Sequence, residues 1–181
     1  MNKSLQTLAD EFALMKEEAA KVLRNTTDKK FNQRPDNNGW SAAECIDHLV
    51  ATGVDYCDQY EKALKLAMNK GYTLDHELKN SWFGQRFINF VEPPVRFKAK
   101  SPKKWKPASN INLAKVTAAY LQLQDRYIDL LAASEGWDIS KVKLPSPASK
   151  LIKFSAFEMM GINAAHQRRH FLQAKKAMGL K

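Results

Sequence analysis

The sequence predicts an all-α fold, a four-helix bundle with a long irregular connection between its second and third helices. Four segments of the 181-residue chain carry apolar residues at alternating steps of three and four, the period of a helix that is buried on one face. Glycine, proline and asparagine separate these segments. Since each helix has a single apolar stripe, the four helices can bury their stripes only against one another. We expect one domain that spans residues 1–181.

The first two helices have clear sequence signals at their ends. The first covers about residues 3–25 and stops in the polar run 25–28. The second covers about residues 41–69 and ends at Gly71. It begins with a capping box, because the Ser41 side chain can accept a hydrogen bond from the Glu44 amide while Glu44 reaches back to the Ser41 amide.

The connection that follows, residues 71–108, is the least regular part of the chain. Prolines interrupt it, and the weak alternation over 91–100 is compatible with a short hairpin. The third helix is predicted over about residues 110–134 and the fourth over about 151–178, each followed by a glycine.

The composition excludes several classes of protein. With 44% hydrophobic residues the chain is not intrinsically disordered, and two cysteines do not make a disulfide scaffold. Cys45 and Cys57 fall on one helix about 18 Å apart, so we expect free thiols, which suit a reducing compartment. No apolar run reaches the roughly 20 residues of a membrane span, and the first residues lack a signal-peptide core. These features predict a cytoplasmic protein without a membrane partner.

The net charge of +10 raises the question of an anionic partner. Six positive charges and two aromatic residues, Phe97 and Trp105, fall within residues 96–106. This basic segment is a solvated loop pinned by its aromatic residues, a guide for an anionic small-molecule substrate, or a nucleic-acid contact. The first interpretation is the simplest, and no nucleic-acid-binding motif accompanies the third.

Three histidines occupy positions where they can act together. His166 and His170 are four residues apart on the last helix, so their rings lie one turn apart on the same face and can bind one ion. His48 on the second helix is a third donor. Asn163 and Gln173 extend the polar row of the last helix, and polar side chains that face a core are costly unless they are paired. Histidines in a satisfied core or at the surface remain the alternative.

Two motifs carry a family resemblance. Trp40-Ser41-Ala-Ala-Glu44-Cys-Ile-Asp-His48-Leu49 resembles the second-helix signature of the DinB/YfiT-like superfamily, and His166-Gln-Arg-Arg-His170-Phe-Leu-Gln173 is similar to its last-helix signature. The resemblance implies a bundle that holds a divalent metal ion on three histidines, which by position are His48, His166 and His170. It also implies relatives that use a low-molecular-weight thiol as cosubstrate, relatives that act as metal-dependent hydrolases, and pairing into homodimers.

Three imidazoles leave at least one coordination position open, as catalytic metal sites do. We expect zinc or nickel, and an S-transferase or a hydrolase that acts on a small molecule. A bundle that binds metal or a small molecule without catalysis is the alternative. Glu44 is the candidate acid–base residue, with helix capping as its other interpretation.

The remaining polar and aromatic residues of the two motifs have simpler interpretations. Gln173 or Asn163 either orients an imidazole or is a core amide. Trp40 is expected to staple the start of the second helix, and Arg168 and Arg169 are expected on a solvated face.

Overall fold

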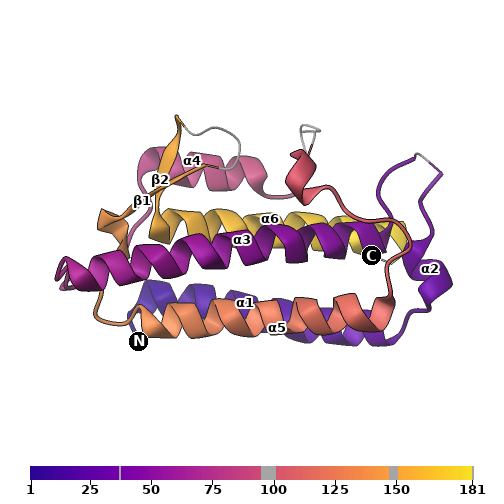
Figure 1. Cartoon of the computed structure of the whole chain (residues 1–181), viewed down its shortest axis with the longest axis horizontal. Coiled ribbons are helices and arrows are strands. Elements are labelled where there is room, and N and C mark those ends of the chain that lie inside the picture. The colour runs from indigo at the N-terminus through magenta and orange to yellow at the C-terminus, as the bar shows by residue number, and fades with distance from the viewer. Residues whose placement is uncertain (37, 95–100, 147–150, 181) are drawn as a thin grey trace.

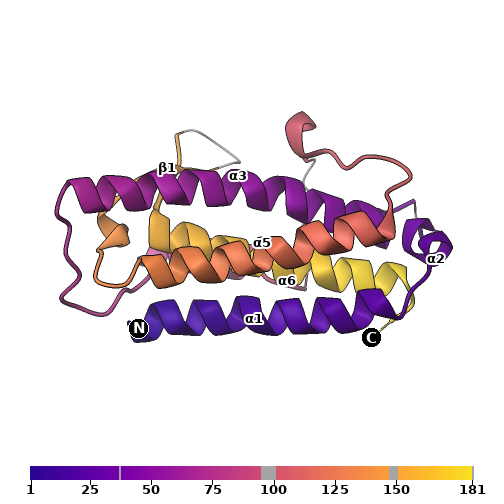
Figure 2. The same ribbon diagram turned by 60° about the horizontal axis from the view of Figure 1, so that its bottom comes forward.

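The computed structural model describes the whole chain except residues 37, 95–100, 147–150 and 181. The described residues are mostly helical, which confirms the all-α class in its broad form. Four long helices lie side by side (Figures 1 and 2): α1 (Lys3–Arg24), α3 (Ala42–Asn69), α5 (Leu113–Ala133) and α6 (Ala156–Ala177). The shorter elements are the helices α2 (Asp28–Asn32) and α4 (Trp82–Val91), the single turns η1 (Lys103–Trp105) and η2 (Ile139–Lys141), and the strands β1 (Lys143–Pro145) and β2 (Lys153–Ser155).

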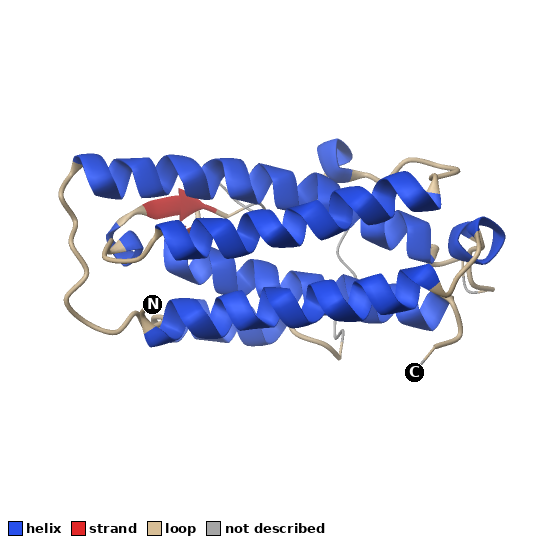
Figure 3. Cartoon of the chain, turned by 90° about the horizontal axis from the view of Figure 1, so that it is seen from below, coloured by secondary structure: helices blue, strands red, loops and turns tan. Residues whose placement is uncertain are grey.

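The long helices form two pairs that lie one upon the other. α1 and α6 run in one direction, and α3 and α5 run in the other (Figure 1). α3 packs against both α5 and α6, and α1 packs against α5. Because the neighbours α3 and α5 are parallel, the chain between them must return along the length of the molecule, and it carries α4 and η1 on the way. Figure 3 shows the α1–α5 side, where helices alone form the surface in front.

The helix ends follow the sequence signals. Ser41 accepts from the Glu44 amide, and Glu44 accepts from the Ser41 amide, so the predicted capping box is present. The glycines Gly71 and Gly179 follow α3 and α6 with φ angles of 63° and 72°. This left-handed conformation lets the chain leave a helix and strains any residue with a Cβ atom.

Several boundaries and elements differ from the sequence prediction. α5 begins at Leu113 instead of 110, since Asn110 has φ 57° and the Ile111 amide donates to the Asn32 side chain. α6 begins at Ala156 instead of 151, because Lys153–Ser155 pair in antiparallel register with Lys143–Pro145. The sequence prediction also missed α2 and α4. The expected hairpin over 91–100 begins at the last residue of α4, and residues 95–100 lie outside the described residues.

α4 packs closely on α6 and encloses its first half. The Glu158 carboxylate caps α6 at the Ser155 amide, and it also accepts from the amide and hydroxyl of Ser81, the N-cap of α4, at 2.9 and 2.5 Å. A Cβ atom at Gly84 would overlap this carboxylate, so the glycine permits the close approach. Residues 156–165 of α6 are therefore buried among α3, α1, α4 and the two strands.

Across the described residues, no helix combines the length and the apolar character that a membrane crossing requires.

Candidate metal centre

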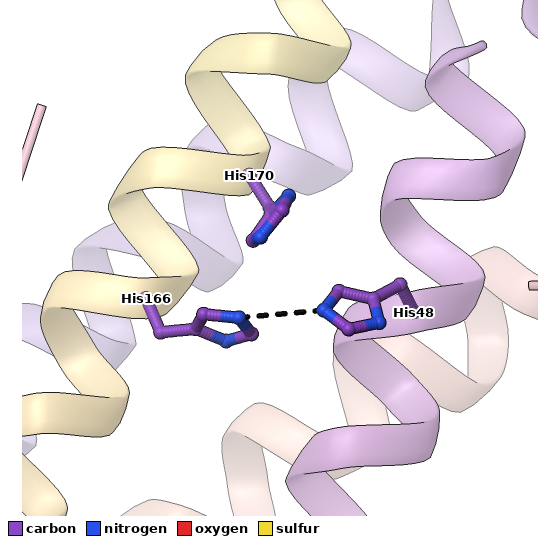
Figure 4. Close-up of side chains that lie close together, drawn as sticks. All are labelled: His48, His166 and His170. Atoms are coloured by element: carbon purple, nitrogen blue, oxygen red, sulfur yellow. Dashed lines mark hydrogen bonds between the residues drawn. The ribbon is translucent and has the colours of Figure 1, made fainter. Parts of the chain in front are cut away.

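The structure brings the three candidate histidines together between α3 and α6 (Figure 4). One ring nitrogen from each of His48, His166 and His170 lies within 4.8 Å of the other two. The Nε2 atoms of His48 and His166 are 3.3 Å apart. The cluster forms because α3 and α6 pack along each other, and because residues 166 and 170 share one face of α6.

Hydrogen bonds orient two of the rings toward the centre of the cluster. His48 Nδ1 donates to the backbone carbonyl of Trp105 at 2.8 Å, and His170 Nδ1 donates to Gln173 Oε1 at 3.1 Å. In a neutral imidazole the other nitrogen, Nε2, then carries the lone pair. Of the two interpretations of Gln173, its hydrogen bond with His170 supports the one in which it orients an imidazole. Asn163 is instead a core amide, because it donates to the Tyr127 hydroxyl at 2.6 Å.

Burial lowers the pKa of all three imidazoles, which favours the neutral form that binds metal ions. Desolvation lowers the pKa of His48 and lowers that of His170 to about 3. The pKa of His166 is well below its usual value, since desolvation acts together with its two histidine neighbours and Arg169. His166 Nδ1 is buried and has no hydrogen-bond partner among the described residues.

This donor set fits a divalent ion. Nitrogen ligands of a tetrahedral zinc ion lie about 3.3 Å from one another, because each Zn–N bond is about 2.0–2.1 Å long. The separation of the His48 and His166 Nε2 atoms, 3.3 Å, matches that spacing. These two atoms are within hydrogen-bond distance of each other (Figure 4), and the other ring nitrogen of His166, Nδ1, is buried without a described partner, which is costly.

The connection between α3 and α5 holds the His48 side of the cluster. Trp105 is buried beside Tyr56, with 6.4 Å between the ring centroids, and its Nε1 donates to Asp55 Oδ2 at 2.6 Å. Farther along, the Ala108 amide donates to Asp47 Oδ2 at 2.9 Å. The connection is therefore fastened to α3 on both sides of His48.

These contacts confirm that Trp105 pins the basic segment. The other aromatic residue of that segment, Phe97, lies outside the described residues, as do Arg96, Lys98 and Lys100. The sequence analysis missed the Trp105 carbonyl as a partner of His48, because every residue has a carbonyl and none is marked by residue type.

A cavity of about 400 Å³ adjoins the three histidines. Trp40 lines it and lies against the cluster, with its ring centroid 4.9 Å from that of His48 and 5.7 Å from that of His170. Trp40 therefore precedes α3, as expected, and its ring also packs against His48 and His170. Arg169 also lines the cavity and is half-buried, so it lies on the histidine side instead of on a fully solvated face. Arg168 forms ion pairs with Glu11 and Glu92.

Glu44, the candidate acid–base residue, has both carboxylate oxygens engaged. It accepts from the Ser41 amide at 2.9 Å and forms a two-pronged ion pair with Arg34. Burial raises the pKa of this carboxyl, but the hydrogen bonds from Arg34 and Ser41 outweigh burial and leave it below its usual value. These contacts describe a helix cap, and the acid–base role stays a prediction.

The predicted state of the two cysteines is confirmed. Cys45 and Cys57 are buried and free, and burial raises the pKa of both thiols, that of Cys57 to about 12.

Comparison with known proteins agrees with the two motifs. The model of the DinB superfamily matches residues 11–174, a range that contains all three histidines. Neither a curated protein nor a solved structure matches the chain.

Proposed function

The chain belongs to the DinB superfamily, and from this premise we propose that it is a metal-dependent enzyme that acts on a small molecule. His48, His166 and His170 would hold a divalent ion, zinc or nickel. One observation carries the proposal: a ring nitrogen from each of three imidazoles lies within 4.8 Å of the other two, beside a cavity.

A bound ion would supply a Lewis acid that lowers the pKa of a thiol or a water molecule and polarises a carbonyl group. The protein supplies the geometry. The Trp105 carbonyl and Gln173 each bind the Nδ1 atom of one histidine and so direct its Nε2 atom inward. Trp40 lies over two of the rings and limits their access to water. Transfer of a low-molecular-weight thiol and hydrolysis are both reactions that such a site can support.

We also propose that the four long helices are the four-helix bundle of this family and that residues 1–181 form one domain. The side-by-side packing of α1, α3, α5 and α6 supports this proposal. The homodimer and the cytoplasmic location stay predictions from the sequence.

A binding protein without catalysis is the second candidate, and the composition of the cavity wall is compatible with it. No carboxylate is found among the described residues that line the cavity. Glu44, the acid that the sequence suggests, is engaged by Arg34 and Ser41. A hydrolase that needs a carboxylate as general base has none at hand in this part of the chain, whereas a thiol transferase or a metal sensor does not need one.

Zinc titration of the metal-free protein tests the site. We expect one equivalent to bind, and His166→Ala to weaken binding by about 100-fold or more, since it removes one of three ligands. His76→Ala is the matched control, because His76 is exposed and outside the cluster. Equal affinities of the two variants would end the metal-site proposal.

Activity separates the enzyme from the binding protein. The zinc-loaded protein would be screened with thiol cosubstrates and a model electrophile, and compared with His170→Ala. Catalysis requires that the wild type be faster than this variant, and equal rates would leave only the binding function.

A further inference from the structure

The cavity beside the histidines has a predominantly apolar wall that the sequence analysis did not reveal. Phe87, Phe90 and Val91 line it from α4, Phe154 lines it from β2, and Ile162 lines it from α6. Phe87 contacts Phe154 with 4.8 Å between the ring centroids, so part of the wall is a continuous aromatic surface. α4 lies along α6, the helix that also carries two of the histidines (Figure 1). One cavity therefore joins an apolar surface to the candidate metal centre.

Few charges face this cavity. Apart from the three histidines, Arg169 is the one residue with an ionic side chain among the described residues that line it. The lysines of the basic segment within the described residues, Lys103, Lys104 and Lys106, do not line it. Lys104 is bound to Asp55 at 2.5 Å. The described part of the wall thus offers one positive charge, at Arg169, and is otherwise uncharged or apolar.

The apolar wall is fixed in place at both ends of α4. At the start of the helix Glu158 accepts from the Ser81 amide and hydroxyl, and after its end Glu92 pairs with Arg168. Between these points Ile88 packs against Gly161, where an added Cβ would lie 2.9 Å from the isoleucine side chain. A wall held in this way is formed before a ligand arrives, as binding cavities commonly are.

We infer that the cavity takes an apolar, ring-containing small molecule and that its polar end faces the three histidines. The apolar body packs on the α4 wall, where burial of apolar surface and ring contacts supply the affinity. The orientation of the polar end rests on the proposed function, but the recognition of the apolar body does not.

Binding of the neutral dye N-phenyl-1-naphthylamine tests the apolar body. The dye is titrated into metal-free wild-type protein, and its fluorescence rises when it leaves water. We expect saturable binding of one molecule that Val91→Glu weakens by about tenfold or more, because a carboxylate would have to be buried against the dye. Phe90→Glu is a second variant that should also weaken dye binding. Because the Phe90 side chain is half exposed, this substitution should leave the fold intact.

Trp82→Glu is the matched control, since it places the same charge on α4 at a side chain that is 78% exposed and does not line the cavity. It should bind the dye like the wild type. The inference is overturned if no saturable binding occurs, if the cavity variants and the control bind equally well, or if millimolar inorganic phosphate displaces the dye.

The polar end is tested with the zinc-loaded protein and two hydroxamates that share one metal-binding group. Benzohydroxamate should bind at least about tenfold more tightly than acetohydroxamate, and Val91→Glu should abolish the difference. Equal binding of the two would overturn the stated orientation. Dye binding without zinc binding would refute the proposed function and the stated orientation but not the recognition of the apolar body, whereas zinc binding without dye binding would refute that recognition alone.

Discussion

The two sides of the α3–α6 pair are built in different ways. On one side, α1 and α5 pack through apolar and aromatic side chains, as where Phe12 stacks on Tyr127 with 4.4 Å between the ring centroids. On the other side, α4 and η1 have fewer buried apolar residues, and polar contacts such as Glu158 to Ser81 and Asp55 to Trp105 add to their apolar packing. We expect the first side to carry most of the stability of the fold. The second side should chiefly set the shape and the ligand orientation of the site.

The largest effect is expected from the apolar side. Phe12→Ala should lower the free energy of unfolding by about 3–5 kcal/mol, because it leaves a cavity at a fully buried ring. Urea unfolding measures this loss. Leu14→Ala on the same helix is the control, since Leu14 is 65% exposed and should cost about 0.5 kcal/mol or less. The zinc affinity of folded Phe12→Ala should equal that of the wild type, and a loss of affinity would mean that the two sides are not separable.

An intermediate effect is expected where α4 is fastened to α6. Glu158→Gln should lower the free energy of unfolding by about 1.5–3 kcal/mol, as it replaces charged hydrogen bonds to Ser81 and Ser155 with neutral ones. Burial raises the pKa of Glu158, but these hydrogen bonds outweigh it and leave the pKa below its usual 4.5. A depressed carboxyl pKa gives stability that is complete above about 4.5 and is lost as the pH falls toward the folded-state value.

Urea unfolding at pH 7 and at several values below 4.5 checks both statements. The wild type should lose stability on acidification more steeply than Glu158→Gln. Parallel curves would show that this carboxylate does not stabilise the docking of α4.

The smallest effect on stability, and a selective effect on the site, is expected at Asp55. Asp55→Ala removes the acceptor of Trp105 Nε1 and frees the carbonyl that holds His48 Nδ1. We expect zinc affinity to fall by about tenfold, the lower end for residues that orient metal ligands, with less than about 1 kcal/mol change in stability. Asp58→Ala, one turn farther along α3 and paired with Arg126 at the surface, is the control.

Competition with a zinc chelator measures the affinity of both Asp55→Ala and Asp58→Ala. Asp55→Asn should restore part of the affinity, because its amide oxygen can still accept from Trp105. If both alanine variants bind zinc like the wild type, the connection does not position His48.

The contrast between the two sides also explains which parts of the molecule could be predicted. α1 and α3 were predicted to within one residue at each end, because their apolar periods and caps are local features of the chain. α4 was missed although Phe83, Phe87 and Phe90 recur at helical spacing, because a ten-residue segment is too short to form a stable helix alone and its docking depends on Glu158, far away in sequence. The late start of α6 has the same cause, because β2 exists only through its pairing with β1.

The sequence by itself determined the helical class, the helix caps and the three histidines as a candidate set, because period, capping motif and four-residue spacing all act within one helix. Only the tertiary structure decided that Trp105 offers its carbonyl to His48, that Arg169 faces the cavity and that α4 builds an apolar wall beside the histidines. The physical reason is the range of the interactions. A hydrogen bond to a carbonyl 57 residues away, or a cavity lined by α3, α4, η1, β2 and α6, depends on how the elements pack and leaves no periodic signal in the sequence.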